Sequence, residues 1–289
     1  MIHWEITLAS CLQRQWKRYR QALQHCQRDF SEEAVHESRV ETRRLMAQIE
    51  LLSVLAEARD FKRARRALKE HLECFNPLRD TQVQLLVLDQ QADAFPDSAV
   101  LRAALRAREK RCLLDASKQI RDVETGRVKK FIAGLLREME ATGASPERRT
   151  LARRAILRAV DNAFELVVER RKQMDPGHVA TIHRTRIAFK TFRYMVEALQ
   201  PLLPEISHAR LESMQAFQAL LGDLQDSDVF LDRVDKFARK TRGRAGSLAG
   251  FRHWLLRRRT QQIDLCMRHA DALLGFWHPR RPVKLRKKG

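Results

Sequence analysis

Apolar side chains recur along most of the chain at intervals of three and four residues, which is the spacing of one face of an α-helix. Near the start, Leu8, Leu12 and Trp16 follow this spacing. Glycine and proline number only 10 and 8, and few runs alternate apolar and polar residues as strands do. The sequence therefore predicts an all-α protein.

Breaks in this pattern divide the chain into helical segments. Ser31, followed by two glutamates, is typical of a helix N-terminus. Asn76-Pro77 and Gly222-Asp223 each predict an interruption within a helical segment. The stretch 142–146, Thr-Gly-Ala-Ser-Pro, is the clearest linker. We expect helices over about 4–29, 32–58, 60–75, 78–94, 96–140 with a bend near Gly126, 147–173, 178–200, 205–221, 224–240 and 248–275.

Two landmarks occur once in each half of the chain and in the same order. The segment VHESRVETRRL begins at Val35, and IHRTRIAFKTF begins 147 positions later at Ile182. Leu78-Arg79-Asp80 and Leu224-Gln225-Asp226 repeat at an offset of 146. Two landmarks in order indicate an internal duplication. We predict two pseudo-symmetric four-helix bundles, over residues 1–142 and 146–279, and a basic tail at 280–289.

Each copy of the first landmark places a histidine and several bases on one face of its helix. Positions i, i+3 and i+7 of a helix share a face. A mostly apolar arc lies beside these positions, so each helix can be buried on one side and present cations on the other. The first stripe is His36, Arg39 and Arg43, and the second is His183, Arg186, Lys190 and Arg193.

Basic residues outnumber acidic ones by 56 to 36, which gives a formal net charge of +20. A surface this basic repels itself and is typical of proteins that bind a polyanion: nucleic acid, an anionic membrane or a phosphate polymer. The alternative is a helical protein whose surface carries solvated arginines.

The sequence predicts a cytoplasmic protein that does not enter a membrane. Its five cysteines are scattered and never in CxxC spacing, which is typical of reduced thiols. The start, Met1-Ile2-His3-Trp4-Glu5, lacks the basic segment and apolar run of a signal peptide. No stretch approaches the ~20 apolar residues of a membrane span.

The two histidine-and-arginine segments, together with the later Leu-x-Asp segments, resemble the CHAD domain (conserved histidine α-helical domain) family over about residues 3 to 275. The resemblance implies two four-helix bundles whose stripes face a basic central groove or pore. It also implies that this groove binds inorganic polyphosphate, and that the protein is a non-catalytic one targeted to polyphosphate granules. The polyphosphate-binding residues that it implies are His36, Arg39, Arg43, Arg44, His183, Arg186, Lys190, Arg193 and Tyr194.

Two departures from the family pattern concern the first copy and the N-terminus. Met46 stands where the second copy has Arg193, and Ala47 stands against Tyr194, so the N-terminal half of the groove is expected to be less cationic. Many relatives begin with a triphosphate-tunnel domain that has a Glu-x-Glu-x-Lys strand. This sequence lacks the motif, so we expect the catalytic half to be absent.

No known catalytic or metal motif supports an enzyme. There is no GxxxxGK[ST], HExxH or GxSxG segment. The pairs His71/Cys74 and Cys266/His269 each supply two ligands, and a structural zinc needs four. We therefore predict no enzyme activity, no cofactor and no metal site.

Several alternatives remain open. Nucleic acid is the main rival ligand, because the basic tail and Arg148, Arg149, Arg153, Arg154 and Arg158 suit a duplex, although the bases and aromatics are not interleaved as stacking platforms. An acidic protein partner is a third candidate. His36 and His183 would be structural instead if they hydrogen-bond to Asp80 and Asp226 or to a backbone carbonyl. The sequence leaves open whether Lys62, Arg63, Arg65, Arg66 and Lys69 line the groove, and which oligomer forms.

Overall fold

The computed structural model describes residues 4–121, 125–241 and 248–278, and all of its regular elements are helices. The predicted all-α class is therefore confirmed for the described residues. The predicted tail at 280–289 and most of the loop expected after Thr241 lie outside them. The α-helices are α1 (Trp4–Arg28), α2 (Glu32–Leu52), α3 (Ala58–Gln90), α4 (Ala99–Arg121), α5 (Gly126–Gly143), α6 (Pro146–Lys172), α7 (Val179–Leu199), α8 (His208–Lys240) and α9 (Ala249–His269). Short 3₁₀ helices are η1 (Ser53–Leu55), η2 (Pro96–Ser98), η3 (Gln200–Leu202) and η5 (Ala270–Gly275).

Serine side chains fix the start of three helices. Ser31 accepts a hydrogen bond from the backbone N–H of Ala34 at 3.3 Å, as its sequence context predicts. Ser145 caps α6 and Ser207 caps α8 in the same way. Each cap satisfies one of the free N–H groups in the first turn of a helix and typically contributes about 1 kcal/mol.

The interruption predicted at Asn76-Pro77 is wrong, because α3 continues through both residues. A proline inside a helix removes one backbone hydrogen bond and crowds the preceding turn. Here the neighbouring turns are held from outside the helix. Arg39 of α2 donates to the carbonyl of Leu72 at 2.9 Å and to the side-chain oxygen of Asn76 at 2.7 Å. Within α3 itself, the hydroxyl of Thr81 also donates to the carbonyl of Pro77 at 2.7 Å.

The interruption predicted at Gly222-Asp223 is also wrong, because α8 is one helix. Leu221 and Leu224 on either side are buried, so packing of the apolar face outweighs the roughly 1 kcal/mol penalty of a helical glycine. In contrast, the single segment expected over 96–140 is divided into α4 and α5, and α5 begins at Gly126 where we expected only a bend.

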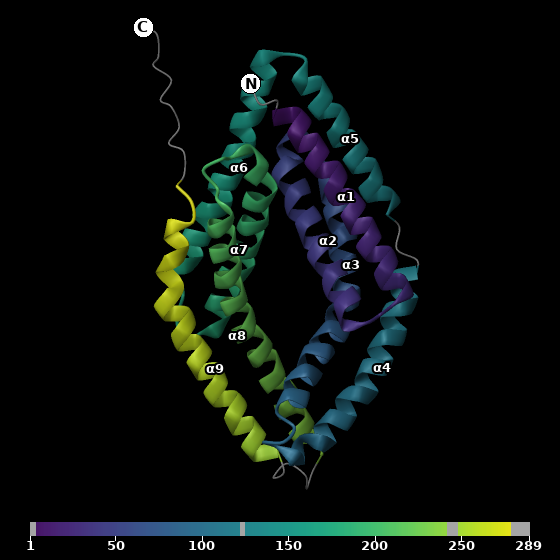
Figure 1. The fold of residues 1–289 in the computed structure, drawn as a ribbon, viewed down its shortest axis with the longest axis vertical. Coiled ribbons are helices and arrows are strands. Elements are labelled where there is room, and N and C mark those ends of the chain that lie inside the picture. Colours follow the sequence, from purple (N-terminus) through teal and green to yellow (C-terminus); the bar gives the residue numbers. More distant parts are fainter. Residues whose placement is uncertain (1–3, 122–124, 242–247, 279–289) are drawn as a thin grey trace.

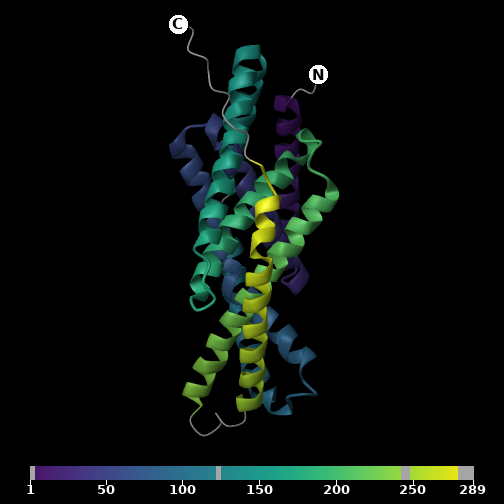
Figure 2. The ribbon, with the colours of Figure 1, turned by 90° about the vertical axis from the view of Figure 1, so that its left-hand side faces the viewer.

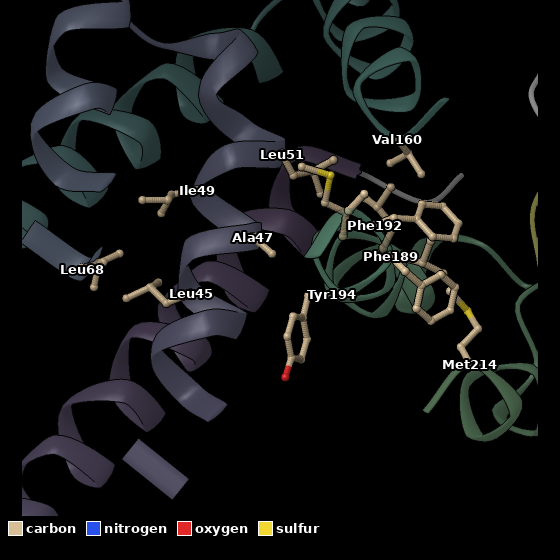
Figure 3. Close-up of a cluster of buried hydrophobic side chains, with 14 of the residues drawn as sticks. Leu45, Ala47, Ile49, Leu51, Leu68, Val160, Phe189, Phe192, Tyr194 and Met214 are labelled. Carbon is tan, nitrogen blue, oxygen red and sulfur yellow. The ribbon is translucent and has the colours of Figure 1, made fainter. Parts of the chain in front are cut away.

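The helices form an elongated molecule in which α1–α5 lie on one side and α6–α9 on the other (Figure 1). The larger hydrophobic core joins the two sides, since it contains residues of α1, α2 and α3 together with residues of α6, α7 and α8. Leu45, Ile49 and Leu51 of α2 contribute to it, as do Phe189 and Phe192 of α7 (Figure 3). This shared core holds α2 against α7.

A smaller core lies at the opposite end of the molecule from α5, where the far ends of α3, α4, α8 and α9 converge (Figures 1 and 2). Phe230 and Phe251 pack edge to face at its centre, with ring centroids 5.5 Å apart. The two sides are thus joined by apolar packing in two places. Between these places lie polar and charged side chains of α2, α3, α7 and α8.

The two copies of the duplicated landmark form helices of the same length. Both α2 and α7 have 21 residues, and each continues into a 3₁₀ helix of three residues. The proposed boundary at 142–146 falls between α5 and α6. The two-fold relation of the halves and their division into separate bundles remain predictions. None of the described helices is long and apolar enough to cross a membrane.

Candidate polyanion-binding site

The packing of α2 against α7 brings the two predicted stripes together. We use the name cationic cluster for five side chains that act electrostatically on one another: Arg39 and Arg43 of α2, Arg79 of α3, and Arg186 and Lys190 of α7. The cluster therefore combines residues from both halves of the chain.

Lys190 shows how crowded this arrangement is. Its side chain is partly buried, and burial together with the charges of Arg43 and Arg186 lowers the pKa of its ammonium group to about 6. Arg39 and Arg193 act in the same direction. A lysine among arginines releases its proton because desolvation and repulsion both disfavour the charged form. In the free protein at neutral pH, Lys190 is therefore mostly neutral.

Arg39 has a structural task in addition to its charge. It is buried, and its guanidinium donates to the carbonyl of Leu72 and to Asn76, next to the proline of α3. Burial and the charge of Arg43 lower its pKa to about 9. Arg39 is thus a brace between α2 and α3, and only part of its donor capacity remains for a ligand.

Arg43 of α2 and Arg186 of α7 are close enough for their charges to interact. Burial lowers the pKa of both groups, and the charge of Arg186 adds to the effect on Arg43. The Nε of Arg186 is buried and has no hydrogen-bond partner among the described residues. A buried donor without a partner is costly, and a bound anion would satisfy it. These two guanidinium groups are the best placed donors of the cluster.

Two carboxylates accompany the cluster without neutralising it. Asp80 of α3 and Asp226 of α8 remain accessible to solvent, yet they are surrounded by protein, and this desolvation raises the pKa of both. Arg39 lies near Asp80, and Arg186 lies near Asp226. Both residues lie inside continuous helices, so neither caps the start of a helix.

The two motif histidines lie at the edge of the cluster. His36 is exposed, and desolvation together with the charges of Arg79 and Arg43 lowers its pKa. His183 is partly buried, and its pKa is lowered by desolvation and by Arg186, while a hydrogen bond with Gln225 opposes the shift. Its Nδ1 is buried without a partner in the described part of the chain. The structural alternative in which His183 bonds to Asp226 is not what the structure shows.

The other three predicted residues, Arg44, Arg193 and Tyr194, form a separate arrangement with Glu197, and we call these four residues the clasp. Glu197 pairs with Arg44 of α2 at 2.9 Å and with Arg193 of its own helix at 3.1 Å, and the second pair has the i, i+4 spacing that lets side chains meet on a helix. Arg193 also donates to Gln218 at 2.8 Å and lies over the ring of Tyr194 at 4.2 Å. The clasp thus ties α2 to α7 beside the cluster, and its charges are largely paired.

The departure at Ala47 has a packing consequence. This small side chain is buried on the side of α2 that faces α7, and Tyr194 lies between the two helices nearby (Figure 3). A small residue allows the helices to approach at this point. The first copy therefore has an alanine in place of the tyrosine at the point where the two halves meet.

Sequence reasoning missed Arg79 and the glutamine partners of the site. Arg79 is the middle residue of the first Leu-x-Asp landmark and pairs with Glu32 of α2, so its position beside a repeated aspartate was an available signal. Gln225 occupies the same position in the second landmark, whereas Gln218 carries no sequence signal. The bases at Lys62, Arg63, Arg65, Arg66 and Lys69 are all exposed, and Arg65, Arg66 and Lys69 lie within 4 Å of glutamates.

Comparison with known proteins identifies the fold. The CHAD domain family matches residues 10–235, which include both stripes and both Leu-x-Asp segments. The chain belongs to the CHAD domain family. The resemblance noted from the sequence is thereby confirmed.

Two solved structures are similar to this CHAD domain along nearly their whole length. The crystal structure of the CHAD domain from the plant Ricinus communis has a TM-score of 0.69 at 18% identity, covering 95% of this chain and 92% of that one. PptA from Streptomyces chartreusis has a TM-score of 0.69 at 15% identity, covering 92% and 98%. No curated protein matches the chain. At these identities the structural likeness establishes the fold and leaves the ligand to be argued from the site.

Among the described residues, no group of three or more histidine, cysteine, aspartate or glutamate side chains is arranged to hold a metal ion. His71, one of the paired candidates, is buried and hydrogen-bonds to Tyr19, and burial lowers its pKa to about 4. His71 is therefore a neutral core residue.

Proposed function

We propose that this CHAD domain binds inorganic polyphosphate at the cationic cluster and does not catalyse its conversion. The observation that carries the proposal is the packing of α2 against α7, which gathers Arg43, Arg186 and Lys190 so that their like charges repel one another, and the low pKa of Lys190 agrees with it. Such repulsion destabilises the folded protein, and a bound polyanion would relieve it. A site of this kind suits a ligand whose charge is dense and repeated.

The chemistry of the cluster favours phosphate groups over nucleobases. Arg43 and Arg186 offer planar guanidinium groups that can each chelate two phosphate oxygens, and Lys190 offers a point charge that returns when an anion approaches. Tyr194, the ring nearest the cluster, is already stacked on Arg193, so it offers no free platform for a base.

The test is a binding measurement with long-chain polyphosphate at two salt concentrations, with DNA and RNA as competitors. The variant Arg43→Met/Arg186→Met/Lys190→Met removes three basic side chains from the cluster. Its matched control is Lys62→Met/Arg63→Met/Arg66→Met, which removes three basic side chains from exposed positions on α3. We expect the first to weaken binding at least roughly 100-fold and the second only slightly. Equal losses would refute the site.

Nucleic acid remains the second candidate because of one structural observation. Arg154 and Arg158 are exposed on α6 and lie one turn apart, so they form a basic surface away from the cluster. If DNA displaces polyphosphate with equal efficiency, and if Arg154→Ala/Arg158→Ala weakens both ligands, the protein is a general polyanion binder. If the wild type strongly prefers polyphosphate to DNA and the triple variant loses this binding, the cluster is the binding site.

The non-catalytic role and the cellular location are parts of the same proposal. We propose that the domain acts in the cytoplasm by attaching to polyphosphate granules. A labelled protein should concentrate on these granules, and the triple cluster variant should remain diffuse while the α3 control stays attached. Incubation with polyphosphate should release no orthophosphate. Release that depends on Arg43 or Lys190 would contradict the binding-only role.

A further inference from the structure

A polar pocket of about 680 Å³ lies next to the clasp. It is bordered by α1, α2, α7 and the first turns of α8, and it is distinct from the cationic cluster. Arg14 and Arg18 of α1 lie one turn apart on its rim, are exposed, and belong to no ion pair among the described residues. Arg44 and Arg193 of the clasp also line it, with Glu197 between them.

The floor of this pocket holds polar groups that lack partners. Gln48 of α2 is only 3% exposed, and its side-chain oxygen has no hydrogen-bond partner in the described part of the chain. The Nε of Arg44 is buried and unpaired in the same way. Buried polar groups are normally satisfied by protein or water. The Nε of Arg44 is a donor that an anion can satisfy, whereas the side-chain oxygen of Gln48 is an acceptor and needs a donor such as water.

The pocket adjoins the cationic cluster through two residues of the clasp that line the pocket and act electrostatically on the cluster. Arg193 lines the pocket and its charge acts on Lys190, and Tyr194 lines the pocket and acts on Arg43. From Lys190 to Glu197, seven residues along α7 correspond to a path of about 10 Å. A ligand that leaves the cluster along this helix therefore passes Arg193 and enters the pocket.

We propose that this pocket is an extension subsite that only long polyphosphate chains reach. The inference rests on polyphosphate binding at the cluster. A chain that continues past Arg193 replaces Glu197 as the partner of Arg44 and then meets Arg14 and Arg18. Tripolyphosphate is too short to follow this path and contacts the cluster alone. The pocket thus makes affinity depend on chain length, and the carboxylate of Glu197 is the competitor that a long chain must displace.

The test compares tripolyphosphate with long-chain polyphosphate on the full-length protein. Arg14→Ala/Arg18→Ala should weaken long-chain binding roughly tenfold and leave tripolyphosphate binding unchanged, because exposed charge-assisted contacts are individually modest. The matched control is Lys17→Ala/Arg20→Ala, which removes the same charge from exposed positions of α1 outside the pocket. It should leave both affinities unchanged.

Glu197→Gln supplies the second arm. Without the competing carboxylate, long-chain affinity should rise several-fold, and tripolyphosphate affinity should change less. The proposal is overturned if the Arg14/Arg18 variant leaves long-chain binding intact, or if it weakens both ligands equally, which indicates a general electrostatic field. If the unmodified protein binds neither ligand, polyphosphate binding itself is wrong, and that outcome is separate from a failure of the subsite alone.

Discussion

Replacing Lys190 by methionine should make the protein more stable and a weaker binder. Methionine has a similar length and no charge, so the change removes repulsion within the cluster and keeps most of the packing. In the folded protein, burial and the charges of Arg43 and Arg186 lower the pKa of Lys190 to about 6, whereas the ordinary lysine value is 10.5. The folded state therefore gives up a proton that the unfolded chain keeps.

The magnitude follows from this difference. At pH 7 the lysine is protonated in the unfolded chain, where its pKa is 10.5. Releasing that proton on folding lowers the stability of the folded state by at most about 5 kcal/mol. Ions from solution screen the cluster, so we expect Lys190→Met to raise the free energy of unfolding by about 1–3 kcal/mol. For a chain of this size, that gain raises the Tm by several degrees.

The pH dependence gives the sharper signature. Because the pKa of Lys190 is lowered in the folded state, the unfolded state binds more protons between about 6 and 10.5, and the stability of the wild type rises with pH across that window. The advantage of Lys190→Met should therefore be absent above the window, grow as pH falls through it, and stay constant below it. Urea unfolding at low ionic strength without phosphate measures this difference.

The control for this experiment is Lys17→Met, which removes an exposed lysine of α1 and should change stability little at any pH. Long-chain polyphosphate binding should weaken in Lys190→Met and stay unchanged in the control. A Lys190→Met protein that is less stable at every pH and binds polyphosphate with unchanged affinity would refute the repulsion argument, because Lys190 would then be an ordinary packing residue.

Three further outcomes follow from the same geometry. Arg39→Met should lower the free energy of unfolding by about 2–4 kcal/mol in urea denaturation, because it removes the hydrogen bonds between α2 and α3 beside Pro77. The control Arg43→Met should not lower it, and equal losses in the two variants would contradict the bracing role of Arg39. Polyphosphate binding near pH 7.5 should be coupled to proton uptake, mainly at Lys190, so the affinity should increase as pH falls. The binding enthalpy measured by calorimetry should then vary with the ionisation enthalpy of the buffer. Identical enthalpies in all buffers would argue against proton uptake. Pro77→Ala should stabilise the protein by about 1–3 kcal/mol in thermal unfolding, since α3 already continues through this position, and a loss would mean that packing requires the proline.

Local patterns predicted the helices well where packing follows periodicity. A helix cap such as Ser31 and an apolar arc are each determined by a few neighbouring residues, so they can be read from the sequence. The same holds for each copy of the duplicated landmark. Pro77 and Gly222 misled the prediction for the opposite reason. Their local preference is to break a helix, but contacts from Arg39 and from buried leucines 221 and 224 outweigh that preference, and such contacts come from elsewhere in the fold.

The candidate site shows a similar limit. Helical spacing placed the bases on common faces, and the structure brings Arg43, Arg186 and Lys190 together. Spacing could not separate cations that remain unpaired from those that carboxylates neutralise. Arg193 and Arg44 lie in the same repeated segments as the other bases, yet both form ion pairs with Glu197. That distinction depends on which residue of α7 meets α2, and the position of a helix–helix contact is set by the shared core.

The same core explains why a repulsive cluster can persist in a folded protein. Apolar packing of Leu45, Ile49, Phe189 and Phe192 fixes α2 against α7, and burying side chains of this size contributes about 1.5–3 kcal/mol each. The core can therefore bear a repulsion of a few kcal/mol in the cluster. Because the core fixes the helices, the backbones that carry the arginines stay close together when the site is empty, and an arriving phosphate chain meets cations that are already gathered. A variant that loosens the core, such as Phe192→Ala, should therefore weaken polyphosphate binding although it changes no charged residue.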